Sequence, residues 1–142
     1  MLCTDTWGTL SMKGSCLCGA ISYEVAALDT AILFCHCQTC RKAHAAPLVP
    51  TAGVMREHFV WLKGEGSLSS FESSPGKIRH FCMLCGTHLV AERPGKPVLI
   101  LRVATLDDAP GAMPEAHIWT SHDLNWLDHE DIPTHHEWQP GR

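Results

Sequence analysis

The sequence predicts a mainly β chain built from short antiparallel strands, with little helix. Apolar residues alternate with polar ones, or gather in runs of about four to six, and Gly, Pro and Ser separate these runs. No segment keeps a helical period beyond about two turns. Cysteines also gather in tight clusters, which is typical of a small β domain stabilised by bound metal. These three observations together define the expected fold class.

The expected elements begin after an N-terminal segment, residues 1–13, which shows no periodicity and should be flexible. Alternation then predicts a strand over 20–25, and the apolar run 31–34 leads into a cysteine-rich segment. Residues 41–46 can form one or two helical turns before Pro47 ends them.

The later strands are predicted from apolar runs bounded by turn-forming residues. They cover residues 59–62, 67–71, 77–81, 87–91, 98–103 and 117–119. The run 98–103 is the most apolar of them, which favours a place in the middle of a sheet. Three tryptophans towards the C-terminal end, Trp119, Trp126 and Trp138, are expected to cover the end of that sheet.

Length and composition narrow the class of protein. A chain of 142 residues suffices for one domain, expected over 14–138 with a tail at 139–142. A net charge of −4 argues against nucleic-acid binding, which needs a basic face. No apolar run approaches the ~20 residues that span a bilayer, and the start lacks a secretory signal pattern. We therefore expect a cytoplasmic protein without membrane association, and predict no particular oligomeric state.

The cysteines are the strongest functional signal. Seven of the eight lie in tight clusters, while Cys3 stands apart with no assigned role. The clusters are two outer pairs, Cys16 with Cys18 and Cys82 with Cys85, and a central triplet, Cys35, Cys37 and Cys40. In a reducing cytoplasm, clustered thiols hold metal more often than they form disulfides. A disulfide framework would suit a shorter, secreted chain.

The spacing favours two zinc ions per chain. Zinc takes thiolates in a tetrahedron, and two ligands from each of two tight turns close such a site. Both outer pairs end in Cys-Gly, and glycine lets each turn curl around the ion. The outer pairs would thus hold a structural zinc. The triplet would hold a second zinc with one position open, which is the arrangement of a reactive zinc site.

Other pairings also fit the spacing. A single zinc held by the triplet and one histidine, His36 or His44, is the leading competitor. His36 lies between two cysteines of the triplet, and in an extended stretch its side chain points the other way. Three buried thiols with no metal are the alternative that involves no ion.

The residues beside the clusters suggest a reaction. Zinc bound by three thiolates keeps a net charge of about −1, and a thiol or carbonyl compound could bind at its open position. Arg41, Lys42 and Arg79 could bind substrate carboxylates. His80 and His44 could move the proton. The triplet, Arg41 and His80 form the expected catalytic set. Serine-triad, phosphate-loop and HExxH patterns are missing, and so is the deaminase signature, in which HxE is followed by PCxxC.

Three motifs resemble those of the glutathione-dependent formaldehyde-activating enzyme (GFA) family, which also includes centromere protein V. They are Gly14-Ser15-Cys16-Leu17-Cys18-Gly19, Cys35-His36-Cys37-Gln38-Thr39-Cys40-Arg41-Lys42, and Arg79-His80-Phe81-Cys82-Met83-Leu84-Cys85-Gly86-Thr87. The segments 106–108 and 114–119, with Trp126, are similar to the C-terminal pattern of the family. The resemblance spans residues 14–138 and every cysteine cluster.

The resemblance implies a β-tent fold with structural zinc at the outer pairs and a second zinc at the triplet. It also implies a carbon-sulfur lyase that joins or splits formaldehyde and glutathione through S-hydroxymethylglutathione. The chain departs from the family after the triplet, where a small residue and an aromatic are usual and Ala43-His44 stands here. The alternative from another class is a non-catalytic zinc module that carries a thiol or binds a partner protein.

Overall fold

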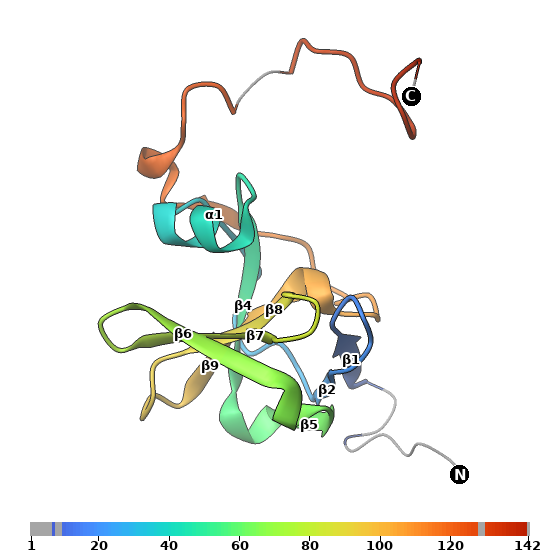
Figure 1. Ribbon diagram of the computed structural model, residues 1–142. Helices are drawn as coiled ribbons and strands as arrows, with labels where there is room; N and C mark the ends of the chain where they lie inside the picture. Colours follow the sequence, from blue (N-terminus) through green and yellow to red (C-terminus); the bar gives the residue numbers. More distant parts are fainter. Residues whose placement is uncertain (1–6, 8–9, 128–129, 142) are drawn as a thin grey trace.

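Two sheets and one short helix make up the fold (Figure 1). The computed structural model describes residues 7, 10–127 and 130–141. The strand order is β1-β2-β5 in the smaller sheet and β10-β3-β4-β9-β8-β7-β6 in the larger one. Neighbouring strands are antiparallel except β10 and β3, which are parallel. The prediction of a mainly β chain with little helix is confirmed.

The strands are β1 Met12–Ser15, β2 Ser22–Val25, β3 Leu33–Cys35, β4 Val49–Met55, β5 Phe59–Lys63, β6 Leu68–Ser74, β7 Lys77–Cys82, β8 His88–Glu92, β9 Val98–Arg102 and β10 Ala116–Ile118. The helix α1 is Gln38–His44, and the four single 3-10 turns are η1 Arg56–His58, η2 Glu65–Ser67, η3 Val103–Thr105 and η4 Thr120–His122. No helix within the described ranges is both long and apolar enough to cross a membrane.

The apolar run 98–103 lies in the middle of the larger sheet, as predicted, because β9 pairs with both β4 and β8. The strand β4 was not predicted, and it contains Pro50. Pro50 lies beside β3 at a point where the pairing with β9 has not yet begun. A proline without an N–H is therefore tolerated there.

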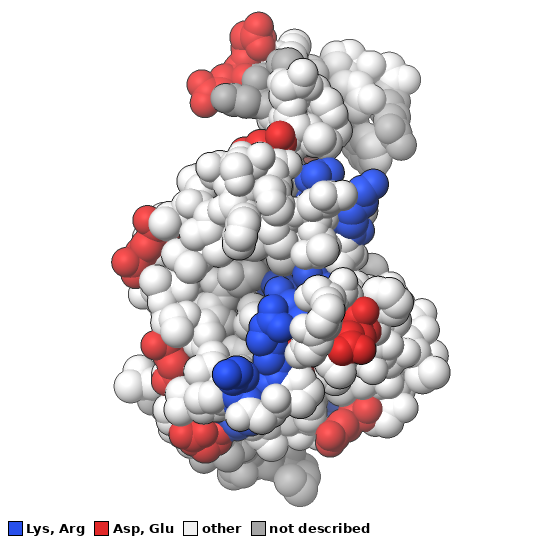
Figure 2. Space-filling view, turned by 90° about the vertical axis from the view of Figure 1, so that its left-hand side faces the viewer, with Lys and Arg blue, Asp and Glu red and all other residues white. Residues whose placement is uncertain are grey.

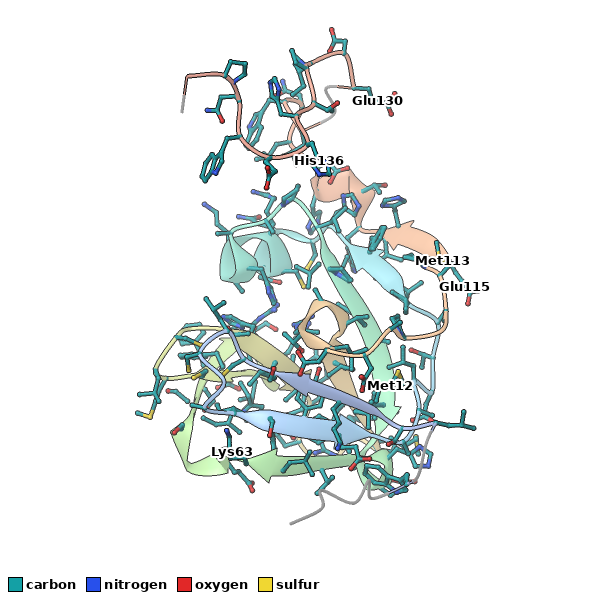
Figure 3. All side chains as sticks on the ribbon, turned by 90° about the vertical axis from the view of Figure 1, so that its right-hand side faces the viewer. Met12, Lys63, Met113, Glu115, Glu130 and His136 are labelled. Atoms are coloured by element: carbon teal, nitrogen blue, oxygen red, sulfur yellow. The ribbon has the colours of Figure 1, made fainter. Side chains whose placement is uncertain are left out.

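The ordered chain begins earlier than the sequence suggested. Residues 1–13 were expected to be flexible, yet Met12 and Lys13 belong to β1. Met12 is 8% exposed and packs in the main core, and Figure 3 shows it on β1 within the body of the molecule. Cys3 lies outside the described residues.

The three C-terminal tryptophans do not cover the sheet, so that prediction is wrong. Trp119, Trp126 and Trp138 are 57%, 61% and 65% exposed. The chain leaves the sheets after β10 and η4, and Glu130 and His136 lie beyond α1, away from both sheets (Figures 1 and 3). The core is closed instead by side chains of the strands.

Tyr23 on β2 is the centre of the main core. Its side chain is fully buried and stacks on Phe59 with ring centroids 5.3 Å apart, and its hydroxyl lies 2.6 Å from Oγ1 of Thr105. Gly14 is its cross-strand partner on β1. A β-carbon at Gly14 would lie 2.2 Å from Cζ of the Tyr23 ring, so the ring occupies the space that a side chain would fill.

We expect Gly14→Ala to destabilise the protein by about 1–3 kcal/mol, because the added methyl group overpacks the core against Tyr23. Urea unfolding of the two proteins measures the difference. Gly66→Ala is the matched control, since a β-carbon there has no neighbour within 4 Å. Equal unfolding free energies for Gly14→Ala and the control would contradict this account of the core.

Glu92 on β8 accepts hydrogen bonds from Nε2 of His80, at 2.6 Å, and from Nη2 of Arg56, at 2.9 Å. Partial burial would raise the pKa of Glu92, but these bonds hold it below the ordinary value of 4.5. A carboxyl with a lowered folded-state pKa stabilises the fold above pH 4.5, and this contribution disappears as the pH falls through the folded-state pKa.

The stability difference between the natural chain and Glu92→Gln should therefore narrow as the pH falls below 4.5. Urea unfolding of both proteins across this range, with an NMR titration of the Glu92 carboxyl carbon, provides the measurement. A difference that stays constant with pH would show that Glu92 is not held in its charged form by its two partners.

Candidate metal centres

The described cysteines gather into two groups. In each group all sulfur atoms lie within 4.8 Å of one another. The first contains the outer pairs, Cys16, Cys18, Cys82 and Cys85, and the second is the triplet, Cys35, Cys37 and Cys40. All seven are free thiols. The structure thus brings together the two sets that the spacing predicted, and no histidine joins either set among the described residues.

The four-sulfur group fits a tetrahedral metal ion. One outer pair lies in the turn between β1 and β2, and the other comprises the last residue of β7 and a residue of the turn that follows it. The Sγ atoms of Cys16 and Cys18 lie 3.6 Å apart, and those of Cys18 and Cys82 lie 3.8 Å apart. Two thiolates at ~2.3 Å from one tetrahedral zinc are about 3.8 Å apart. A disulfide would need ~2.05 Å.

The local sequence shapes both turns for this task. Gly19 and Gly86, which follow the outer pairs, have φ of 79° and 81°, in the region that favours glycine. Thr87 connects the two turns, because its Oγ1 accepts a hydrogen bond from the amide of Leu17 at 3.0 Å. The same hydroxyl lies 3.3 Å from Sγ of Cys85 and lowers the pKa of Cys85 to about 5, which favours the thiolate.

The triplet lies where β3 passes into α1. Cys35 ends β3, Cys37 caps the helix, and the amide of Cys40 donates to Sγ of Cys37 at 3.3 Å. Cys35 and Cys40 are 7% and 1% exposed, whereas Cys37 is half-buried. Burial raises the pKa of Cys35 to about 12. Burial also opposes ionisation of Cys37, but the Thr39 hydroxyl and the Cys40 amide lower its pKa to about 6. The triplet is therefore approached from the side of Cys37.

Arg79 on β7 contacts the triplet directly. It is 1% exposed, and its Nη1 and Nη2 donate to Sγ of Cys40 at 3.8 and 3.7 Å. Its Nε donates to Oγ of Ser73 at 2.7 Å, and its Nη2 to Oγ1 of Thr39 at 3.3 Å. These bonds fix the guanidinium in place, so that its charge offsets the charge of a Cys40 thiolate. Sequence analysis proposed Arg79 as a group that binds substrate carboxylates and did not predict its contact with Cys40.

Two further cations near the triplet were missed by sequence reasoning. Lys77 and Arg102 lie close enough to Cys40 for their charges to interact with it, and burial lowers the pKa of each. Arg102 is 3% exposed at the end of β9. The signal in the sequence that could have identified Arg102 is its place as a charged residue at the end of the most apolar strand. Figure 2 shows lysine and arginine side chains gathered along a hollow on one face of the molecule.

Several predicted residues lie away from the triplet. His80 neighbours Arg79 on β7 and therefore faces the opposite side of the sheet, where it bonds to Glu92. His36 bonds to Asp123 at 2.6 Å and to His117 at 2.8 Å. Neither histidine reaches the triplet sulfurs.

The two remaining candidates lie on α1. Burial lowers the pKa of His44 to about 3, so its imidazole is neutral near pH 7 and is a poor base. Arg41 lines a hollow of about 490 Å³ between α1 and residues 124–127, separate from the contacts that Arg79 makes. Trp126 lines the same hollow.

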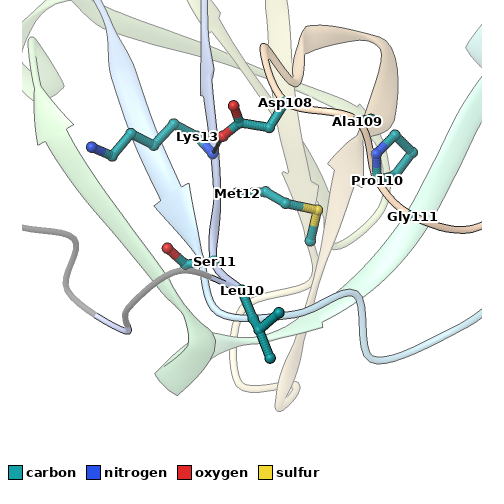
Figure 4. Close-up of a pocket in the computed structure, with 8 residues that line it drawn as sticks. All are labelled: Leu10, Ser11, Met12, Lys13, Asp108, Ala109, Pro110 and Gly111. Atoms are coloured by element: carbon teal, nitrogen blue, oxygen red, sulfur yellow. Dashed lines mark hydrogen bonds between the residues drawn. The ribbon is translucent and has the colours of Figure 1, made fainter.

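A groove of about 480 Å³ opens beside the triplet. It is lined by Thr39, Lys42, Ala43, Phe71, Ser73, Arg79, Phe81 and His88. Thr39 and Arg79 line this groove and also contact Cys37 and Cys40, although no cysteine itself lines the groove. A larger hollow of about 590 Å³ lies beside β1, between residues 10–13 and 108–111 (Figure 4), and is lined by no cysteine.

A mainly β fold with one four-thiol and one three-thiol group defines a protein with two candidate metal centres. The model of the family described as glutathione-dependent formaldehyde-activating enzyme matches residues 11–122, and the chain belongs to this family. A crystal structure of a Rhodobacter sphaeroides protein from structural genomics superimposes with a TM-score of 0.60. The two are 25% identical, over 75% of this chain and 98% of that one. The predicted family is confirmed.

Proposed function

We propose that the protein is a zinc-dependent carbon-sulfur lyase of the formaldehyde-activating type. Its substrate would be the adduct of a small aldehyde with a small thiol such as glutathione, in the cytoplasm, where thiols stay reduced. The observation that carries the proposal is the unequal division of the sulfurs. Four close one group, and three form a group that adjoins a groove. Membership of the family supports the same reaction.

The two groups would hold one zinc ion each, with different roles. The four thiols supply a complete tetrahedron, which suits a structural ion. The three thiols leave one position for a substrate, on the half-buried side of Cys37. Zinc bound there would supply a positive centre that lowers the pKa of a substrate thiol.

The reaction itself needs only the breaking or forming of one carbon-sulfur bond. In the splitting direction the electron pair of that bond goes to sulfur, and the hydroxyl proton passes to water as the carbonyl forms. Arg79, held by Ser73 and Thr39, keeps its charge beside Cys40 throughout. It thus limits the build-up of negative charge when a thiolate is released.

The groove fits a thiol that carries carboxylates. Lys42 and Arg79 supply positive charge on its wall, while Phe71 and Phe81 supply apolar surface. A cation beside a carboxylate gives a charge-assisted hydrogen bond, and the aromatic rings exclude water from the carbon that reacts. Glutathione has both kinds of group, so its recognition here is part of the proposal.

Native mass spectrometry should find two zinc ions per chain. Cys37→Ser should keep one zinc ion and the fold, because the four-sulfur group is intact. Cys85→Ser should unfold the chain, because a structural zinc contributes on the order of 10 kcal/mol, as much as the whole stability of an ordinary domain. Circular dichroism reports the fold of each variant. A natural chain with a single zinc ion would contradict the proposed division of roles.

The zinc-loaded protein should accelerate the exchange between S-hydroxymethylglutathione and its components, followed by NMR. We expect Cys37→Ser to reduce the catalysed rate at least about a hundredfold, to near the uncatalysed reaction, because a ligand of the reactive ion is lost. Cys3→Ser is the matched control and should keep full activity. A natural chain that binds glutathione but leaves this exchange at the uncatalysed rate would favour the non-catalytic zinc module instead.

A further inference from the structure

One cavity of about 270 Å³ collects buried nitrogen atoms that have no hydrogen-bond partner. It lies between the end of α1, the start of β4 and the segments 87–88 and 102–105. The atoms are Nε2 of His44, Nδ1 of His88, and Nε, Nη1 and Nη2 of Arg102. Within the part of the chain that the structure describes, only Nε of Arg41 shares this condition. Such a concentration of donors at one place favours a site for an acceptor group.

Arg102 is the dominant group in this cavity. It is 3% exposed, and an ionised side chain buried without a partner is strongly unfavourable. Cys40 is near enough to stabilise the charge of Arg102, yet no nitrogen of the guanidinium makes a hydrogen bond of acceptable geometry. Arg79 already donates twice to the sulfur of Cys40. The donors of Arg102 therefore remain available to another acceptor.

The two histidines complete a wall that suits an anion. Their ring centroids lie 4.7 Å apart, and burial lowers the pKa of both, so each is neutral near pH 7. A neutral imidazole offers one N–H donor without adding a second charge. The lining also includes the hydroxyl-bearing Thr87 and Thr105, and it contains no Asp or Glu.

The cavity adjoins the triplet. His44 follows Cys40 by four positions on α1, so both side chains lie on the same face of the helix, with β-carbons about 5–6 Å apart. His88 lines this cavity and also the groove beside the triplet. The cavity and the groove thus share His88, and the cavity includes His44 from the helix face that carries Cys40.

We propose that this cavity binds the carboxylate group of a small acid. The planar fork of Arg102 would hold both carboxylate oxygens, and His44 and His88 would each donate one hydrogen bond. The volume is below that of pockets for drug-sized molecules, so a short acid fits and a tripeptide does not. This inference rests on the proposed function, under which the carboxylate belongs to the substrate, on either its aldehyde part or its thiol part.

Acetate is the probe. Acetamide, which has the same shape but no charge, is the control. In the zinc-loaded protein, acetate should shift the NMR signals of the His44 and His88 imidazoles in a saturable way, and acetamide should not. Arg102→Met should weaken acetate binding at least about tenfold, and Arg102→Lys should retain part of it. Arg93→Met, which removes an exposed arginine between β8 and β9, should bind acetate normally.

Two results would overturn the proposal. One is the lack of an acetate-dependent shift in the natural chain. This measurement does not depend on whether any variant folds. The other is loss of the second zinc ion in Arg102→Met, which would assign Arg102 to the metal centre. We expect Arg102→Met to keep both zinc ions and an unfolding midpoint at least equal to that of the natural chain, because an unpartnered buried charge is removed.

Turnover assays distinguish the source of the carboxylate. If the aldehyde carries it, Arg102→Met should slow the reaction of glyoxylate with mercaptoethanol and spare that of formaldehyde with mercaptoacetate. The reverse holds if the thiol carries it. Acetate binding without any turnover would leave the cavity assigned and reject the lyase. Turnover of S-hydroxymethylglutathione without acetate binding would reject the cavity alone.

Discussion

The contact between the two sheets depends on the four-sulfur group. One outer pair lies in the turn between β1 and β2 of the smaller sheet, and the other lies at the end of β7 and in the turn that follows it in the larger sheet. Strands of three to seven residues bury little apolar surface on their own. Cys16 and Cys82 are also part of the main core around Tyr23, so the four-sulfur group and the apolar packing bring the two sheets together at the same place.

Charge is the second constraint on this molecule. Three thiols near one another, two of them buried, favour a cation, and Lys77, Arg79 and Arg102 lie near the triplet as well. Buried cations at the ends of β7 and β9 would be unfavourable in an ordinary apolar core. The fixed bonds of Arg79 to Ser73 and Cys40 leave Arg102 with donors facing a small cavity. The triplet and the cavity thus share the charge of Arg102.

Sequence reasoning succeeded where the signal was local. It located β9 in the middle of a sheet from its apolar run, and it ended the helix before Pro47. It missed β1, which is too short to show alternation. It also missed β4, which contains Pro50 and begins two residues after Pro47. It also placed the C-terminal tryptophans over the sheet, because aromatic residues are usually buried. Their exposure depends on the path of the chain after β10, which no local pattern encodes.

By itself, the sequence determined which residues can serve as metal ligands and where the chain can turn. Close spacing of cysteines and the glycines after them are local requirements of tetrahedral ligation, and they are visible without a structure. Only the tertiary structure decided which side chains meet. Alternation along β7 places Arg79 and His80 on opposite faces, but only packing against α1 turned Arg79 to the triplet and left His80 with Glu92. The approach of Arg102, remote in sequence, has the same cause.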